Sequence, residues 1–431
     1  MSNPIHSTSA KSVLPMLAMR GLATGLCAGC VVGLLRLSHD RAAARVALWL
    51  EEVWWTVPIW FGVLVALAVI LRRIVREEPL ISGSGIPQTE LALAGRLSFT
   101  WWRVLLAKFL GSWLALFGGL ALGREGPSIQ MGGAVGAGFH ALWRPAAPHA
   151  LTGSPYVVAG AVAGLAAAFG APAAGVLFAF EEMKSRRDTS LIVAACASAI
   201  GAHLMIRIVF GMGRILPFAG FEAPPLSSFW IVALEGAVFG VLGVGYNKTL
   251  LWLHDREAGQ TLIPDRWRAL PPLLLAGCLA LFAPLLIGGG ESLIIFVGEH
   301  DVALKTLILL LAFKYLFAQY STVASIPGGL LMPILCLGAL WGRLWAELPV
   351  SALAAHGLAS GSVQPYVLFG MVSYFAATVR APLTGIVLVT EMSGTYTCLP
   401  GSLLAGLIAC KVANLLHCPP VYDSLKERIR L

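Results

Sequence analysis

The sequence contains few charged residues. Of its 431 residues, 30 are Lys or Arg and 22 are Asp or Glu, so 12% carry a formal charge, whereas soluble domains carry about 25%. Apolar residues make up 58% of the chain, and its mean hydropathy is +0.80. A soluble globule has no means of burying this much apolar surface, which excludes a soluble enzyme, a disordered protein and a secreted disulfide scaffold. The composition predicts an all-α polytopic membrane protein.

Cysteine and histidine provide no metal-binding framework. The eight cysteines and nine histidines are scattered, and Cys27 and Cys30 form a C-x-x-C pair inside an apolar segment without a second pair. We therefore expect no metal and no cofactor. The net charge of +8 comes partly from clusters between apolar segments, such as Arg72, Arg73 and Arg76. Such clusters are typical of cytoplasmic loops, and they lack the interleaved aromatic residues that stack on bases, so no nucleic-acid partner is expected.

The apolar residues are arranged in runs, and a spanning helix needs about 20 apolar residues. Three short, broken runs, near 126–139, 330–345 and 383–390, are expected to re-enter rather than cross the bilayer. We predict a cytoplasmic N-terminal tail over 1–20, membrane repeats over 21–213 and 229–416, a linker over 214–228 and a short C-terminal tail over 417–431. The longer runs lie near 21–35, 57–71, 104–122, 157–180, 190–210, 229–252, 270–287, 305–325, 365–379 and 401–416.

Two motifs recur about half a chain length apart, which predicts an internal repeat. The segment Ala171–Glu181 matches Ala381–Glu391, with its proline displaced by 210 residues, and Pro127 matches Pro333 with a displacement of 206. Repeats in secondary transporters are often inverted and place their sites at the bilayer midplane. An odd number of crossings in each half would make this repeat inverted.

Three Gly-Pro motifs precede helix-like apolar runs: Gly83–Pro87 (GSGIP), Gly123–Pro127 (GREGP) and Gly329–Pro333 (GLLMP). Proline is tolerated in the first turn of a helix, and glycine permits the turn before it. Each motif therefore predicts a helix N-terminus, whose free amides and positive dipole end favour anions. If the three converge, they form an anion site without a cage of cations.

Carboxylates and hydroxyls near these motifs are candidates for chemistry. Glu125 lies in an apolar region, where a carboxylate is costly unless it is paired or protonated. It either competes with anions and carries a proton, or pairs with Arg124 or Lys108 as a structural group. Glu181 and Glu182 end an apolar run, one as a boundary residue and the other as a proton acceptor, unless both are simply solvated there. Glu391 is expected to be structural. Ser84 and Tyr396 either donate hydroxyls to an anion or serve as a cap and an interface aromatic.

Taken together, these motifs resemble the CLC family of chloride channels and proton/chloride antiporters, over roughly residues 20–416. The resemblance implies a two-fold inverted repeat of tilted and re-entrant helices, and a homodimer with one pore per subunit. It implies that Ser84, Tyr396 and the backbone amides of Leu330 and Leu331 bind the anion. It makes Glu125 the external gate and Glu182 the internal proton-transfer residue. The supporting residues are Gly83, Gly85, Pro87, Lys108, Gly123, Arg124, Gly126, Pro127, Gly329 and Pro333.

The sequence departs from the family pattern at two positions. Leu331 stands where an aromatic residue is usual, which bears on anion selectivity, and Gln88 stands where Glu is common. The resulting prediction is a chloride/proton exchanger, and not an enzyme, in the lipid bilayer of the inner cell membrane with both termini cytoplasmic. The alternatives are a passive chloride channel or a fluoride/proton exchanger on the same fold. From other classes, they are a cation-coupled solute carrier or an intramembrane hydrolase, although Ser84 has no histidine near it in sequence.

Overall fold

The computed structural model of the chain describes residues 6–52, 55–147, 149–184, 188–218, 221, 223–355 and 363–429, and this part is mainly helical. The first half contains α1 (His6–Glu52), α2 (Thr56–Glu77), α3 (Ile86–Leu93), α4 (Trp101–Phe117), α5 (Glu125–Trp143), α6 (Pro155–Phe169), α7 (Pro172–Glu181) and α8 (Thr189–Leu204). The second half contains α9 (Phe229–Gly259), α10 (Leu270–Phe282), α11 (Glu291–Glu299), α12 (Leu304–Val323), α13 (Leu331–Trp345), α14 (Ser351–Ala355), α15 (Gln364–Val379), α16 (Pro382–Ser393), α17 (Leu399–Leu415) and α18 (Val421–Lys426).

The two halves share local structure down to single side chains. Lys108 in α4 donates hydrogen bonds to the carbonyls of Ile81 and Gly83, at 2.8 and 2.7 Å. Lys314 in α12 donates in the same way to Leu286 and Gly288, at 2.9 and 2.7 Å. The glycine turns that follow also match, with φ values of 64° and 93° before α3, and of 64° and 105° before α11. The repeat predicted from two motifs therefore extends to a buried lysine and the loop that it holds.

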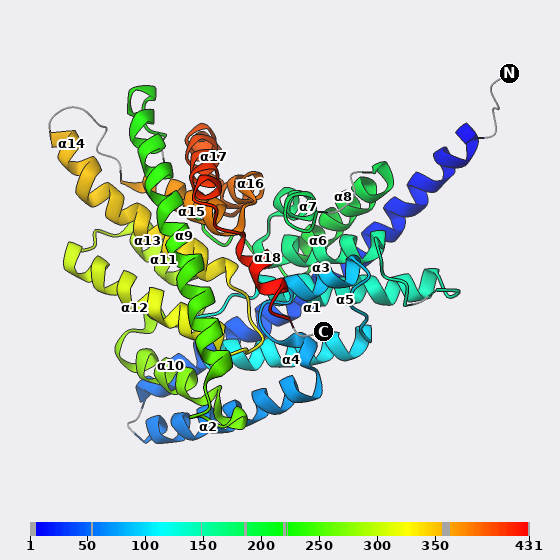
Figure 1. Cartoon of the computed structure of the whole chain (residues 1–431), viewed down its shortest axis with the longest axis horizontal. Coiled ribbons are helices and arrows are strands. Elements are labelled where there is room, and N and C mark those ends of the chain that lie inside the picture. Colours follow the sequence, from blue (N-terminus) through cyan, green and yellow to red (C-terminus); the bar gives the residue numbers. More distant parts are fainter. Residues whose placement is uncertain are drawn as a thin grey trace.

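The contact between α7 and α16 shows that the repeat is inverted. Glu181, at the end of α7, accepts hydrogen bonds from the first-turn amides of Leu383 and Thr384 in α16, at 3.1 and 2.6 Å. Glu391, near the end of α16, accepts them from Ala173 and Ala174 in α7, at 3.2 and 2.9 Å. Each helix therefore ends where the other begins, so these equivalent helices run antiparallel, side by side in Figure 1. The predicted all-α inverted repeat is confirmed.

Close helix packing in both halves depends on glycine. In α5 and α6, Gly132 and Gly160 lie so close that a Cβ on Gly160 would be 2.0 Å from the Gly132 carbonyl oxygen. In α13 and α15, a Cβ on Gly370 would be 2.4 Å from the Gly338 carbonyl oxygen. Small residues permit this approach where lipid provides no hydrophobic drive between helices. The same pair of helices is thus packed in the same way in each half.

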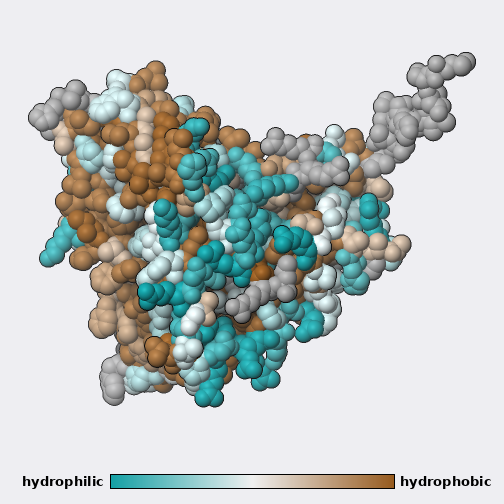
Figure 2. Space-filling model, in the orientation of Figure 1, coloured by the Kyte–Doolittle hydropathy of each residue, from teal (hydrophilic) through white to brown (hydrophobic). Residues whose placement is uncertain are grey.

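The membrane-crossing helices differ from the apolar runs, and two of the differences have a visible local cause. Within the described residues, seven helical segments are long and apolar enough to span a bilayer. The run at 157–180 is split into α6 and α7, because Gly170 adopts a φ of 67° and Pro172 starts a new helix. The segment expected to be short at 330–345 continues through a π-helical turn to Leu353 and is long enough to cross. Figure 2 shows apolar residues along the left of the molecule, and hydrophilic residues gathered over its centre.

Both predicted tails are more structured than expected. Helix α1 begins at His6, so most of the segment 1–20 extends the first helix, while residues 1–5 lie outside the described part of the chain. The C-terminal segment turns back into the molecule as α18, which packs against α3 and lies near the centre of Figure 1. Val421 and Tyr422 in α18 are fully buried. Helix α18 therefore packs into the folded molecule through these buried residues, and only Arg430 and Leu431 of the segment 417–431 are not described.

One buried carboxyl gives a test of stability. Glu235 in α9 is fully buried, and neither of its oxygens has a hydrogen-bond partner among the described residues. Leaving a buried polar group unpaired costs about 1–3 kcal/mol. We therefore expect Glu235→Leu to raise the free energy of unfolding by about this amount, measured by thermal unfolding in detergent. Glu235→Gln, which keeps the polar group, should leave stability unchanged. A loss of stability in the leucine variant would contradict the prediction.

Candidate anion and proton site

The three Gly-Pro motifs meet at one point. The backbones of Gly123 and Gly329 pair with each other, through N–H to O distances of 2.7 and 2.6 Å. The amide of Gly328 donates to the carbonyl of Gly83 at 3.0 Å. The loops before α3, α5 and α13 are thus joined by main-chain hydrogen bonds, and the N-termini of α5 and α13 lie together. The geometry on which the predicted anion site depends is present.

Lys108 binds backbone carbonyls of the loop before α3 and not a carboxylate. Its side chain is fully buried, and its Nζ donates to the carbonyls of Ile81 and Gly83, which flank the turn before Ser84. A buried ammonium group needs such partners. The suggestion that Lys108 pairs with Glu125 is therefore wrong, and Lys108 fixes the path of the backbone around Ser84.

Glu125 is fully buried at the start of α5 and has no salt bridge among the described residues. Its carboxylate lies against Gly123, where a Cβ would be 2.0 Å from Oε2, and close to the backbone amides of Glu125 itself and of Met332 in α13. The neighbouring Arg124 instead pairs with Glu291 at 2.5 Å and with Asp40 at 3.4 Å. The carboxylate of Glu125 thus lies at the amino end of a helix, where an anion would be favoured.

The first turn of α13 provides the amides of this site. Leu330 is the N-cap residue and Leu331 the first helical residue, and both are buried. The first amides of an α-helix have no intrahelical acceptor. Pro333 follows within the first turn, where its missing N–H is no loss. The amides at the start of α13 are therefore available to a carboxylate or an anion.

The tyrosine in this region is Tyr422 and not Tyr396. The Ser84 hydroxyl and the Tyr422 phenol lie near each other, both side chains are buried, and neither oxygen has a hydrogen-bond partner among the described residues. Tyr396 is 62% exposed. It follows Gly394, which ends α16 with a φ of 76°, and the chain there turns to the surface. The prediction that Tyr396 lies with Ser84 is wrong.

The sequence did not predict Tyr422 as a site residue, because it lies in the segment 417–431 that was expected to be a C-terminal tail. The only signal in the sequence is Pro419-Pro420 before Val421, which marks a helix N-terminus like those of the three motifs. Nothing in six helical residues shows that they pack against α3. The position of Tyr422 depends on the tertiary fold.

Glu181 and Glu182 have different surroundings. Glu181 caps α16 and is a structural residue. Glu182 is buried beyond the end of α7, and the charged groups that act on it are Glu90, Asp423, Lys426 and Lys184.

Those four groups form a network on the α18 side of the molecule. Lys184 and Lys426 lie 2.8 and 2.7 Å from Asp423, and Lys426 also contacts Glu90. Burial would raise the pKa of Asp423, but the two lysine hydrogen bonds hold it below its ordinary value. The network links Glu182 to the hydrophilic surface around α18.

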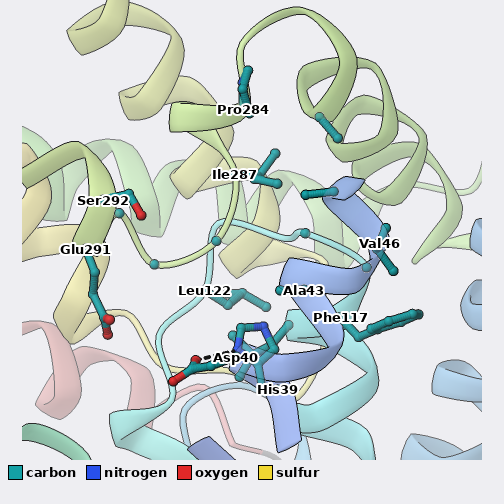
Figure 3. Close-up of a pocket in the computed structure, with 18 of the residues that line it drawn as sticks. His39, Asp40, Ala43, Val46, Phe117, Leu122, Pro284, Ile287, Glu291 and Ser292 are labelled. Atoms are coloured by element: carbon teal, nitrogen blue, oxygen red, sulfur yellow. Dashed lines mark hydrogen bonds and ion pairs between the residues drawn. The ribbon is translucent and has the colours of Figure 1, made fainter. Parts of the chain in front are cut away.

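A wide cavity leads to Glu125 at the N-terminal end of α5. It has a volume of about 700 Å³ and is lined by α1, the loop before α5, the loop before α11 and Met332. Figure 3 shows His39 and Asp40 on α1, with Glu291 on the wall formed by α11. Within the described ranges, no three His, Cys, Asp or Glu side chains are placed to hold a metal ion. The site thus consists of helix ends, hydroxyls and carboxyls.

Comparison with known proteins identifies the family. The profile described as voltage gated chloride channel matches residues 62–414. The chain belongs to the CLC family. The CLC chain is 35% identical over 429 residues to an H(+)/Cl(-) exchange transporter ClcA of Vibrio campbellii, covering 97% of this chain and 89% of that protein. A protein of the same name from Yersinia pestis is 33% identical over 422 residues, covering 93% and 86%.

Solved structures agree with this assignment. A slow cyanobacterial Cl-/H+ antiporter superposes on the CLC chain with a TM-score of 0.86 and 28% identity, covering 95% of this chain and 97% of that one. A CLC-type fluoride/proton antiporter, at 18% identity, has the same fold with a TM-score of 0.71 and coverage of 98% and 99%. The family predicted from the motifs is confirmed.

Proposed function

We propose that this protein exchanges chloride for protons across a membrane. The observation that carries the proposal is the place of the Glu125 carboxylate, beside the amides of α13, where it competes with an anion for the same helix end. Relatives at 33–35% identity are named H(+)/Cl(-) exchange transporters. Protonation of Glu125 neutralises it and allows it to leave, which makes the same carboxyl both the gate and the proton carrier.

The anion in this proposal is held by hydroxyls and backbone amides rather than by cations. Ser84 and Tyr422 provide hydroxyls, and Leu330 and Leu331 provide amides; Tyr422 replaces Tyr396 as the tyrosine in this role. Partial charges of this kind bind a chloride ion reversibly, which transport requires. Leu331 presents an aliphatic side chain next to this path.

Protons in this proposal move between Glu182 and Glu125. Glu182 is reached from the α18 side through the network of Glu90, Asp423, Lys184 and Lys426. The Tyr422 phenol is within electrostatic range of both Glu182 and Glu125, so it lies along the same route. Side-chain movement and water connect the two carboxyls, and neither step needs a metal or cofactor.

The distribution of basic residues indicates how the protein is oriented in the membrane. Lys184, Lys426 and Arg428 lie on the α18 side, and basic residues concentrate in cytoplasmic loops. We therefore place the α18 side in the cytoplasm, with both termini there, and the 700 Å³ cavity on the outer side of the inner cell membrane. The family resemblance adds a homodimer with one pore in each subunit.

The test of the proposed function is coupled flux. The protein is reconstituted into vesicles, a chloride gradient is imposed without a proton gradient, and chloride and proton movement are recorded together. Exchange predicts uphill proton movement that stops when the chloride gradient is removed. Chloride flux without proton movement would show a passive channel, and fluoride efflux faster than chloride efflux would show a fluoride exchanger.

Tyr422 and Tyr396 provide a matched pair for the anion site. We expect Tyr422→Phe to weaken chloride binding by about fivefold to tenfold, because a hydrogen bond to a charged group contributes about 1.5–3 kcal/mol and neighbouring donors compensate in part. Tyr396→Phe removes the same atom from an exposed position and should leave binding unchanged. Isothermal titration of the purified protein with chloride measures both. Equal effects of the two substitutions would contradict the assignment of Tyr422.

A further inference from the structure

The wall of the outer cavity holds one arginine between two carboxylates. Arg124 lines the cavity, yet only 7% of its side chain is exposed. Its Nη2 donates to Glu291 at 2.5 Å and its Nη1 to Asp40 at 3.4 Å, while its Nε has no hydrogen-bond partner among the described residues. The two carboxylates come from α11 and α1, on different walls of the cavity, as Figure 3 shows. We call Arg124, Asp40 and Glu291 the mouth clamp.

The backbone sets the position of Glu291. It is the first residue of α11, where the helix dipole favours a carboxylate. Gly290 before it adopts a φ of 105°, and a Cβ there would be 2.4 Å from Cys336 Sγ, so the turn is tightly held. This turn is the second-half counterpart of the one before α3, so Glu291 stands where the first half has Ile86. The second half thus carries a fixed negative charge that the first half lacks at this position.

The clamp makes the mouth of the cavity unfavourable to anions. Of the described residues that line the cavity, Arg124 is the one with a permanent positive charge, and His39 lies beside Asp40, with 3.3 Å between Nδ1 and Oδ1. The negative charges that line the same cavity are those of Asp40, Glu291 and, when ionised, Glu125. Arg36, buried behind the wall, acts on the same groups and donates to the Ala167 carbonyl at 2.7 Å. An anion approaching Glu125 from this side therefore meets a cation that two carboxylates already neutralise.

We propose that the mouth clamp determines the affinity for anions on the cavity side: Asp40 and Glu291 hold Arg124 and thereby keep chloride binding at this mouth weak. This proposal rests on the anion transport proposed above and assigns Asp40 and Glu291 as specificity-determining residues. Neutralising Glu291 leaves Arg124 with one longer contact, so its charge becomes available to an incoming chloride. The readout is the chloride concentration for half-maximal anion flux at constant pH, which can be measured whether or not chloride movement is coupled to protons.

The experiment uses Glu291→Gln in the full-length protein, reconstituted into vesicles. Chloride is titrated on each side in turn. We expect half-saturating chloride to fall by about fivefold on the cavity side alone, because removing one nearby charge at intermediate dielectric changes binding by about 1 kcal/mol. The maximal flux should change little. Asp40→Asn should act in the same direction but by only about twofold, because Asp40 is 56% exposed and solvent screens it.

Glu299→Gln is the matched control. Glu299 is exposed and lies at the opposite end of the same helix from Glu291, and its substitution removes the same charge. Its half-saturating chloride should equal that of the wild type. If Glu299→Gln shifts chloride affinity as much as Glu291→Gln, a general surface charge is responsible and the proposal is wrong.

Two other outcomes are informative. Unchanged or weaker chloride affinity in Glu291→Gln overturns the proposal. If Glu291→Gln fails to fold, Asp40→Asn alone decides the test, and an unchanged chloride affinity in Asp40→Asn overturns the proposal. A wild type that moves chloride without protons refutes exchange but leaves this test intact, so the two failures are distinguishable.

Discussion

Replacing Glu125 with glutamine is expected to abolish proton transport and to make anion flux independent of pH. Glutamine has the shape of a protonated glutamate but neither carries a proton nor competes as an anion for the amides of α13. Because proton transfer through a positioned carboxyl typically contributes about 10²–10⁴-fold, proton flux should fall by at least about a hundredfold. Vesicle assays of chloride and proton flux over a range of pH measure both effects.

The control for this substitution is Glu235→Gln. Glu235 is also fully buried, in α9, and lies outside the residues that line the cavity, so its replacement tests for a general effect of removing a buried acid. The control should retain wild-type coupling and pH response. Persistent coupling in Glu125→Gln would remove Glu125 from the proton route and would leave the gate without its proposed chemistry.

Replacing Glu182 with glutamine is expected to stop proton transport while chloride flux continues. Glu182 lies on the α18 side, away from the cavity that leads to Glu125, so its loss interrupts the proton route without changing the anion ligands. Proton flux should fall by at least about a hundredfold, with chloride flux in the range of the wild type. The ratio of the two fluxes in vesicles is the measurement.

Glu181→Gln separates this role from a structural one. Glu181 is adjacent in sequence but caps α16, so its replacement should lower thermal stability and leave the flux ratio as in the wild type. Loss of coupling in Glu181→Gln with normal coupling in Glu182→Gln would reverse the assignment of the pair.

The three helix N-termini at these motifs were predictable because local chemistry determines them, whereas their meeting at one point depends on the tertiary fold. Glycine and proline at fixed positions specify a turn and a helix start, whatever the helix later packs against. Glu125 belongs to one of these turns, so its position followed from the motif. The two offsets of about half the chain also indicated that the second half would supply α13.

The positions of the tyrosines were not predictable in this way. Tyr396 and Tyr422 each precede or begin a helical segment after a break, and exposure alone distinguishes them. That difference arises because α18 folds back against α3, a contact between residues more than 300 positions apart. Arg124 was likewise unpredictable, since its partners come from α1 and α11. Sequence spacing carries no information on which distant helix covers a site.

The reciprocal capping of α7 and α16 limits how the molecule changes state. Glu181 and Glu391 tie each half to the other, and the paired backbones of Gly123 and Gly329 add a third tie near the centre. Rocking one half against the other would break all of these contacts at once and leave helix ends bare in a medium without water. These contacts oppose rigid-body rocking of one half against the other and favour a change of access through rotations of single side chains.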